Sequence, residues 1–270
     1  MAALWLALLV AAPLAVIAAI SLAVPDEGLP PFRLGAPLAD NEAWPLLAAD
    51  GFYAAALLRS LLLAAVTAGC CLLLSYPMAL GLLRLPARLR PWVVGLILLP
   101  FAIGFVLRMA AWVGLLRDSG PINAALLALG LIAEPLPLLY GWSGLFLGMV
   151  HSYLIFALLP LYAALSARDP RLEEAAADLG ASPAVVFFTV TLPASAAAAG
   201  AAFLLVFIPA AGEFVVPELL GPPEALLAGR AIWLEFFQSR DWPLAAAASL
   251  ALLLVLVGPI LLWQRLGRAP

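Results

Sequence analysis

The sequence has 270 residues, of which 66% are hydrophobic and 11% are charged, and its formal net charge is −3. Soluble proteins carry roughly 25% charged residues, so the composition excludes an ordinary soluble domain. Hydrophobic stretches of about 18 residues or more recur, each long enough to cross a hydrocarbon core about 30 Å thick. None alternates polar and apolar residues as the strands of a membrane barrel do. The sequence therefore predicts an all-α, polytopic membrane protein.

Six hydrophobic segments predict six membrane spans in a single transmembrane domain that takes in residues 1–270. They are expected at about residues 2–24, 53–83, 91–116, 143–167, 194–216 and 242–263. The first lacks a basic leading region and a clear cleavage site, and it is too long for a signal sequence, so we interpret it as a retained helix. Residues 25–52 form a proline-rich outer loop whose role the pattern does not show.

Arginine placement predicts the orientation, because the chain has no lysine. Seven arginines fall on one side of the six-span arrangement: Arg84, Arg88, Arg90, Arg168, Arg171, Arg265 and Arg268. Short cytoplasmic loops retain positive residues, so this side is the cytoplasm and both termini lie there. Most acidic residues fall on the opposite side.

Cysteine and histidine indicate no redox or metal chemistry. Cys70 and Cys71 are adjacent in the middle of a span, where a free cysteine acts as a small hydrophobic residue. One histidine and no clustered carboxylates predict no metal site.

Residues 168–193, between the fourth and fifth spans, carry helix start and stop signals. Asp169 is a good N-cap and Pro170 a good first helical residue for a short helix from Leu172 to Leu179. Gly180 supplies the left-handed residue that ends such a helix. A second cap-then-proline start at residues 182–183 begins an apolar helix.

This second helix is expected to run to about Thr191, and Leu192 before Pro193 predicts a break ahead of the fifth span. The pattern thus predicts a helix–turn–helix elbow on the cytoplasmic face. Small side chains at residues 175–177 would let another protein approach the backbone. The alternative is an amphipathic loop that only connects two spans.

At these residues the chain resembles a known family. The segment from Glu174 to Pro193 is similar to the E-A-A-x3-G-x9-I-x-L-P loop of ATP-binding-cassette (ABC) importer permeases. It reads Glu174-Ala175-Ala176, then three residues, Gly180, and nine residues up to and including Thr189, followed by Val190-Thr191-Leu192-Pro193. Valine for isoleucine is the single departure. Wider segments resemble the spermidine/putrescine permease subfamily: Ser75-Tyr76-Pro77, Pro100-Phe101, Gly120-Pro121-Ile122-Asn123, Phe207-Ile208-Pro209, Gly212-Glu213-Phe214 and Pro217-Glu218-Leu219-Leu220-Gly221.

The resemblance implies one half of a two-subunit channel in a bacterial inner membrane, of the type I permease fold. Its partners would be a cytoplasmic ATPase dimer, a second and paralogous permease, and an external solute-binding protein, with no nucleic acid. ATP and magnesium would bind the ATPase, and this chain would bind no cofactor. The ATPase-coupling residues implied are Glu173, Glu174, Ala175, Ala176, Asp178, Gly180, Leu192 and Pro193.

ATP hydrolysis by this chain through a phosphate-binding loop is excluded on its own residues. Such a loop needs a lysine that reaches the phosphates, and the chain has none. If transport is driven by ATP, a partner ATPase is therefore required.

Two other classes of function remain as alternatives. One is an intramembrane serine protease, which the segment Gly141-Trp142-Ser143-Gly144 together with His151 resembles. However, eight residues of helix place Ser143 and His151 about 12 Å apart. A nucleophile and its base need to be about 3 Å apart. An ion-gradient-driven transporter would need carboxylates at mid-membrane and internal repeats, which the sequence does not show. A permease for another small solute is the nearest alternative.

Polyamines are the leading cargo because acidic and aromatic residues suit flexible polycations. The candidate pathway residues are Glu213, Phe214, Glu218, Trp112, Asp118, Glu235 and Asp241. Ordinary outward-facing acids would give the same pattern. Pro209 and Gly212 are expected to kink the fifth span beside Glu213 and so orient its carboxylate. We expect Arg108, near the outer end of the third span, to form a structural ion pair; an anionic cargo would reverse that preference.

Overall fold

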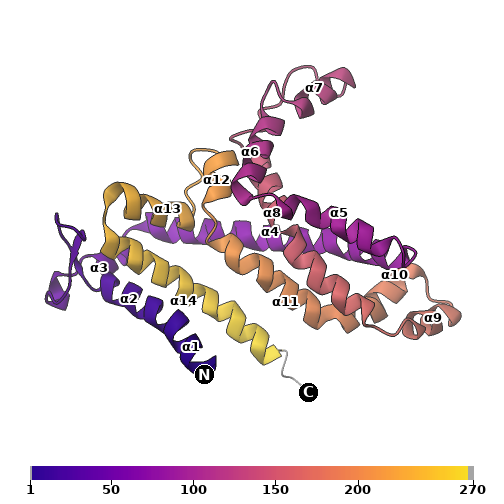
Figure 1. Cartoon of the computed structure of the whole chain (residues 1–270), viewed down its shortest axis with the longest axis horizontal. Helices are drawn as coiled ribbons and strands as arrows, with labels where there is room; N and C mark the ends of the chain where they lie inside the picture. Colours follow the sequence, from indigo (N-terminus) through magenta and orange to yellow (C-terminus); the bar gives the residue numbers. More distant parts are fainter. Residues whose placement is uncertain (1, 267–270) are drawn as a thin grey trace.

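The computed structural model describes residues 2–266, which fold mainly as helices (Figure 1). The long helices are α4 (Gly51–Arg84), α8 (Trp142–Ser166), α11 (Leu192–Ala211) and α14 (Trp242–Leu266). The shorter ones are α1 (Ala2–Leu6), α2 (Ala12–Ser21), α3 (Ala43–Ala49), α5 (Arg90–Ala102), α6 (Phe105–Leu116), α7 (Pro121–Ala128), α9 (Arg171–Asp178), α10 (Pro183–Val186), α12 (Val215–Leu220) and α13 (Ala228–Leu234).

Three π-helical segments and one 3₁₀ turn interrupt or extend these helices: η1 (Ala7–Ala11), η3 (Phe187–Thr191), η4 (Glu235–Ser239) and the 3₁₀ turn η2 (Leu38–Asp40). Strands β1 (Val24–Pro25) and β2 (Phe32–Arg33) form a small antiparallel hairpin in the expected outer loop, with Val24 opposite Arg33. Within residues 2–266, five helices are long and apolar enough to cross a membrane, or six if the bent pair of α5 and α6–α7 is one span.

The core is built by α4, α8 and α11, which lie side by side. The buried face of α4 consists mainly of small residues at helical spacing, among them Ala56, Ser60, Ala64, Ala68 and Cys71. Small side chains let helices approach closely in a membrane, where packing rather than exclusion of water holds them together. Larger residues on the facing helices, such as Met149 and Val206, then fill the space between them.

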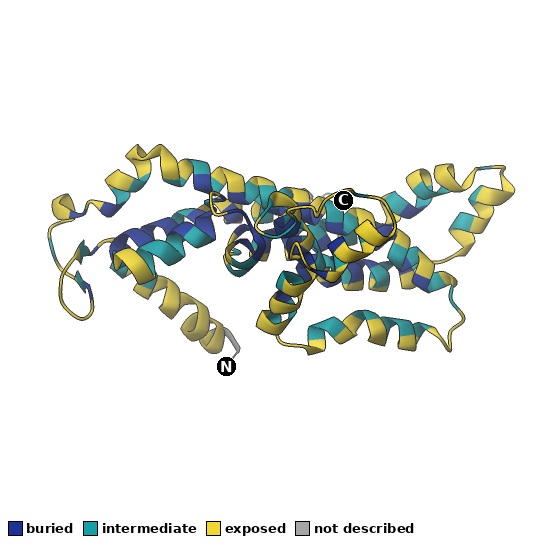
Figure 2. Ribbon diagram, turned by 90° about the horizontal axis from the view of Figure 1, so that it is seen from above, coloured by how far each residue is buried: buried dark blue, intermediate teal, exposed yellow. Residues whose placement is uncertain are grey.

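The N-terminal segment α1–η1–α2 lies outside this core, and its helix α2 packs against α14 (Figures 1 and 2). Only 6% of the apolar stretch Leu4–Ser21 is buried. Asn41 ties the outer loop to the end of α2, since its Nδ2 donates to the carbonyl oxygens of Ser21 at 3.1 Å and Ala23 at 2.7 Å. The outer loop is thus held on the protein.

The third hydrophobic segment differs from the straight span expected at residues 91–116. It is split into α5 and α6, which meet at a bend of 92°. Ile103 and Gly104 between them have extended backbones, and Pro100 removes a helical hydrogen bond one turn earlier. Helix α5 alone has 13 residues, about 20 Å, which is too short to cross the hydrocarbon core unaided. Hydropathy alone does not reveal the bend.

The fifth hydrophobic segment also differs from expectation, at both of its ends. The break predicted at Leu192 is wrong, because one continuous helix runs from Pro183 to Ala211 through the π-helical segment η3. The widened π turn makes room for the ring of Pro193 and its missing N–H. At the other end the helix stops at Ala211 instead of kinking and continuing to residue 216, and a separate helix, α12, follows.

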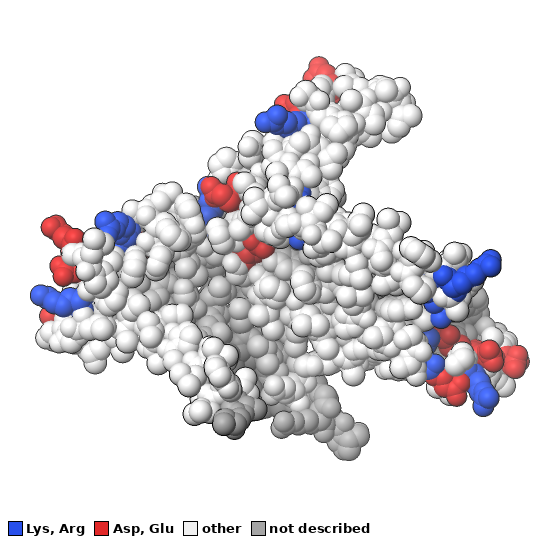
Figure 3. Space-filling model, viewed as in Figure 1, with Lys and Arg blue, Asp and Glu red and all other residues white. Residues whose placement is uncertain are grey.

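Charged side chains gather at the two ends of the long axis and on the projecting arm formed by α6 and α7, with few between (Figure 3). The end that carries α9 and α10 also holds the turn between α4 and α5, so two of the predicted arginine clusters meet there. Of the expected tail cluster, Arg268 lies outside the described residues.

Candidate functional site

The loop at residues 168–193 forms the helix–turn–helix elbow that its start and stop signals predict. The Asp169 carboxylate accepts a hydrogen bond from the Arg171 N–H at 3.0 Å, and Ser182 Oγ accepts one from the Val185 N–H at 3.4 Å. Gly180 has a φ of +86°, and the N–H of Ala181 donates to the carbonyl oxygen of Ala176 at 3.1 Å. This is the hydrogen-bond pattern of a glycine-terminated helix.

The elbow exposes most of the expected coupling residues. Glu174, Ala175 and Asp178 are exposed, Ala176 is half-buried, and Leu179 is 90% exposed. A charged and apolar surface at a helix end that the rest of the chain leaves uncovered suits docking to another protein. At the base of the elbow Leu192 is half-buried and Pro193 exposed.

Glu173 differs from its neighbour Glu174, although both were expected to contribute to the same surface. Its Oε1 atom lies 2.8 Å from Arg168 NH1 and accepts a hydrogen bond from the Thr191 hydroxyl. The side chain of Arg168 is 11% exposed, and Thr191 is buried. Glu173 therefore holds the elbow to the start of the fifth span instead of facing outward.

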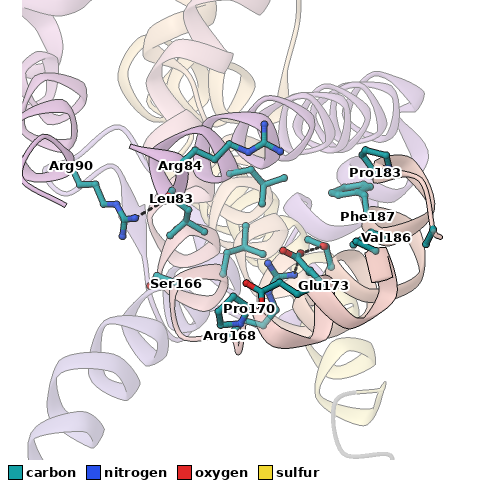
Figure 4. A pocket seen from close by; sticks show the side chains of 16 residues that line it. Leu83, Arg84, Arg90, Ser166, Arg168, Pro170, Glu173, Pro183, Val186 and Phe187 are labelled. Carbon is teal, nitrogen blue, oxygen red and sulfur yellow. Dashed lines mark hydrogen bonds and ion pairs between the residues drawn. The ribbon is translucent and has the colours of Figure 1, made fainter. Parts of the chain in front are cut away.

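A cavity of about 600 Å³ separates the elbow from the ends of α4 and α8 (Figure 4). Arg84, Arg90 and Arg168 line it together with Glu173 and Phe187. Arg90 closes the end of α4, since its Nε and NH2 atoms donate to the carbonyl oxygens of Leu85 and Leu83 at 2.9 and 2.6 Å. The Arg168–Glu173 ion pair and the Thr191–Glu173 hydrogen bond thus hold the elbow beside this cavity.

Glu213, the first candidate pathway residue, lies in the break between α11 and α12. Its Oε1 accepts hydrogen bonds from the N–H groups of Phe214 at 3.0 Å and Val215 at 2.8 Å, and so caps α12. Its Oε2 accepts one from the Tyr153 hydroxyl of α8 at 2.6 Å. The carboxylate is therefore placed firmly at the junction of α8, α11 and α12.

The other candidate pathway residues do not form one cluster. Glu218 pairs with Arg230 at 2.8 Å, and Glu235 accepts a hydrogen bond from the Tyr53 hydroxyl at 2.8 Å. Asp241 accepts one from the Leu244 N–H at 2.9 Å at the start of α14. Asp118 is exposed on the arm.

Burial raises the pKa of the Asp241 carboxyl above its ordinary value. The hydrogen bond from Leu244 opposes this shift, and the neighbouring carboxylates of Glu235 and Glu42 add to it. No group of three or more His, Cys, Asp or Glu residues suited to a metal ion occurs among the described residues.

Aromatic contacts account for the remaining candidates. Phe214 stacks on Trp233, with ring centroids 6.3 Å apart, and Trp112 packs edge-on against His151 at 5.2 Å. Ser143 and His151 lie on the same helix, α8, so the protease geometry is not formed.

The ion pair expected for Arg108 is absent from the described residues. Its guanidinium lies 4.5 Å from the ring centroid of Phe101 and 5.3 Å from that of Phe105, and NH1 donates to the carbonyl oxygen of Pro100 at 3.3 Å. The bend between α5 and α6 brings these rings to the arginine, and cation–π contacts take the place of a carboxylate.

Sequence reasoning missed the partners of three acidic residues: Tyr53, Tyr153 and Arg230. The sequence around Tyr153 does not indicate that this residue binds a carboxylate, because its partner Glu213 lies 60 residues away. Only the packing of α8 against the end of α11 brings the two together.

A polytopic helical core with a capped elbow at one end defines a membrane permease component. Residues 4–263 match the family model described as "Binding-protein-dependent transport system inner membrane component", and the chain belongs to this family. It is therefore a multi-pass inner-membrane transport component and not an enzyme.

Curated relatives agree. The spermidine/putrescine transport system permease protein PotB of Escherichia coli (strain K12) is 36% identical over 219 residues, which cover 81% of this chain and 80% of that protein. PotB of Haemophilus influenzae is 35% identical over 216 residues, covering 80% and 76%. The inner membrane ABC transporter permease protein YdcU of Escherichia coli is 31% identical over 225 residues, covering 78% and 71%. The resemblance to the spermidine/putrescine subfamily is thus confirmed.

The fold is also known from solved structures. A crystal structure of a bacterial ABC transporter that imports the acidic polysaccharide alginate matches with a TM-score of 0.74 and 18% identity, covering 99% of this chain and 92% of that one. The predicted all-α ABC-permease fold is confirmed.

Proposed function

We propose that this chain forms half of the translocation pathway of an ATP-driven importer of polyamines such as spermidine and putrescine. The similarity to PotB over 81% of the chain carries the cargo assignment. A carboxylate at the junction of three helices, Glu213, with stacked aromatic rings on the adjacent Phe214 and on Trp233, suits an ammonium group.

The partners follow from the family and from the elbow. A cytoplasmic ATPase dimer would dock on the exposed face of α9 and bind ATP and magnesium, and an external solute-binding protein would deliver the cargo. A second, paralogous permease would complete the pathway. ATP-driven closure of the ATPases would then rock the helices between inward- and outward-open states.

Docking is tested by the ATPase activity of the purified complex. In the wild type, cargo-loaded binding protein should stimulate hydrolysis. Glu174→Lys reverses a charge on the exposed face of α9 and should abolish stimulation while the complex remains folded. Arg88→Glu, a charge reversal in the nearby turn between α4 and α5, is the control and should leave stimulation unchanged.

The same assay tests the cargo. Spermidine or putrescine on the binding protein should stimulate hydrolysis, and an anionic solute should not. An anion that stimulates where polyamines fail would reject the polyamine assignment but keep the ABC importer. If no ATP-binding-cassette ATPase associates with the chain, the assignment as a subunit of an ATP-driven importer is wrong.

A further inference from the structure

Five polar residues form a hydrogen-bonded track from the elbow into the apolar core, and at Thr191 the track passes through the backbone carbonyl oxygen. Arg168 pairs with Glu173, whose carboxylate accepts a hydrogen bond from the Thr191 hydroxyl. One helical turn further, Ser195 Oγ donates to the carbonyl oxygen of Thr191 at 2.7 Å and lies 3.0 Å from the Tyr76 hydroxyl. The track therefore joins the end of α8, the elbow, the start of α11 and α4.

The direction of these hydrogen bonds is determined by the available protons. Ser195 has one hydroxyl proton, and the carbonyl oxygen of Thr191 receives it. When Ser195 donates to Thr191, Tyr76 is the donor to Ser195. Each hydroxyl of the track thus has a defined partner.

The track is buried where it enters the core. Thr191 is 2% exposed, Ser195 3% and Tyr76 9%. Their surroundings are apolar and include Leu158, Leu161 and Leu165 of α8. A buried hydroxyl without a partner costs free energy, so displacement of Thr191 or Ser195 relative to Tyr76 is penalised.

The track also spans the π-helical segment η3. Thr191 is its last residue, and Phe187, its first, packs edge-on against the Tyr76 ring with centroids 5.4 Å apart. Tyr76 therefore contacts the first residue of this widened turn through its ring, and through its hydroxyl it contacts Ser195, one helical turn beyond the last residue. π-Helical turns are frequent at functional sites because they depart from regular helical hydrogen bonding.

We propose that Glu173, Thr191, Ser195 and Tyr76 form a coupling junction, which makes the elbow move together with α11 and α4 when a partner displaces it. These are positioning residues: none belongs to the exposed docking face, and each acts through its neighbour. The inference rests on the proposed ATP-driven function, and it assigns separate roles to the adjacent Glu173 and Glu174. The exposed glutamate docks the ATPase, and the inward one transmits the displacement.

The first test measures the network itself, without cargo. Thermal unfolding of the purified complex is compared for Glu173→Gln, Tyr76→Phe and the double variant. Glu173 and Tyr76 are linked only through Thr191 and Ser195, and the stability losses of two independent sites normally add. A double variant that is as stable as the less stable single variant would therefore show that both residues belong to one network. Strict additivity would overturn the proposal.

The second test measures coupling in proteoliposomes as cargo transported per ATP hydrolysed. Tyr76→Phe and Ser195→Ala should keep the ATPase bound but lower this ratio by about 2- to 30-fold, the range that substitutions along coupling networks span. Loss of one interhelical hydrogen bond lowers the stability of a membrane protein measurably but not enough to prevent folding, so both variants should fold. The matched control is Tyr162→Phe, whose hydroxyl makes no hydrogen bond to a described residue.

The outcomes separate this proposal from the proposed function. An unchanged ratio in both variants, or an equal loss in the Tyr162→Phe control, would overturn the junction. If the wild type transports nothing, the importer reading fails, and the unfolding cycle still decides whether the four residues form one network.

Discussion

At the scale of single residues, the backbone conformation of Gly180 gives the sharpest prediction. A left-handed residue with a Cβ costs about 1–2 kcal/mol, and asparagine tolerates this conformation better than other residues. Gly180→Val should therefore distort the elbow and abolish stimulated ATP hydrolysis, whereas Gly180→Asn should retain most of it. Equal activity of the two variants would show that the turn does not need this conformation.

Glu213 offers a second prediction at this scale. Removing its charge with Glu213→Gln should lower polyamine transport by about 10- to 150-fold, since hydrogen bonds to charged groups contribute about 1.5–3 kcal/mol. The transport rate is measured at saturating cargo-loaded binding protein. Glu224→Gln, at an exposed carboxylate, is the control and should transport at the wild-type rate. Equal rates for the two variants would remove Glu213 from the pathway.

At the scale of helices, Gly229 explains how α13 approaches the end of α11. A methyl group at Gly229 would overlap the backbone carbonyl oxygens of Gly212 and Glu213, while one at Gly258 in α14 would meet nothing. The buried Ser60 of α4 holds the same end of α13, since its Oγ accepts a hydrogen bond from the Ala228 N–H at 2.8 Å.

Gly229→Ala should therefore destabilise the protein by about 1–3 kcal/mol, as overpacking against a backbone does. Thermal unfolding in detergent measures the change, with Gly258→Ala as the control that should unfold at the wild-type temperature or above. A Gly229→Ala variant as stable as this control would mean that α13 moves away without cost.

The helices also show where local sequence reasoning ends. The short helix of the elbow was predictable to within a residue or two because its caps, Asp169 and Gly180, act on their own backbone. The bend at Ile103–Gly104 and the continuous helix through Pro193 were not predictable. A proline or glycine permits a break, and packing against neighbouring helices decides whether one occurs.

At the scale of the whole molecule, the arginine distribution predicts that both termini are cytoplasmic and that residues 25–52 lie outside. A green fluorescent protein fused to the C-terminus should fluoresce, and alkaline phosphatase fused within residues 25–52 should be active. Phosphatase fused at residue 88, in the turn between α4 and α5, is the control and should be inactive. The reverse pattern would invert the orientation and place the elbow outside.

The class of protein follows from the amino-acid sequence alone. The composition shows that the protein lies in a lipid bilayer, and the hydrophobic segments mark most of its helices. The motif spacing from Glu174 to Pro193 identifies the permease family. These signals are local or compositional, so no knowledge of packing is needed to read them.

Only the tertiary structure decided which polar groups meet. It turned Glu173 inward and Glu174 outward, gave Glu213 its partner Tyr153, and joined Tyr76 to Ser195 across 119 residues of sequence. The physical reason is that a buried polar group must find a partner, and in a helical bundle that partner usually lies on another helix. The geometry of helix packing, which no local pattern specifies, makes that choice.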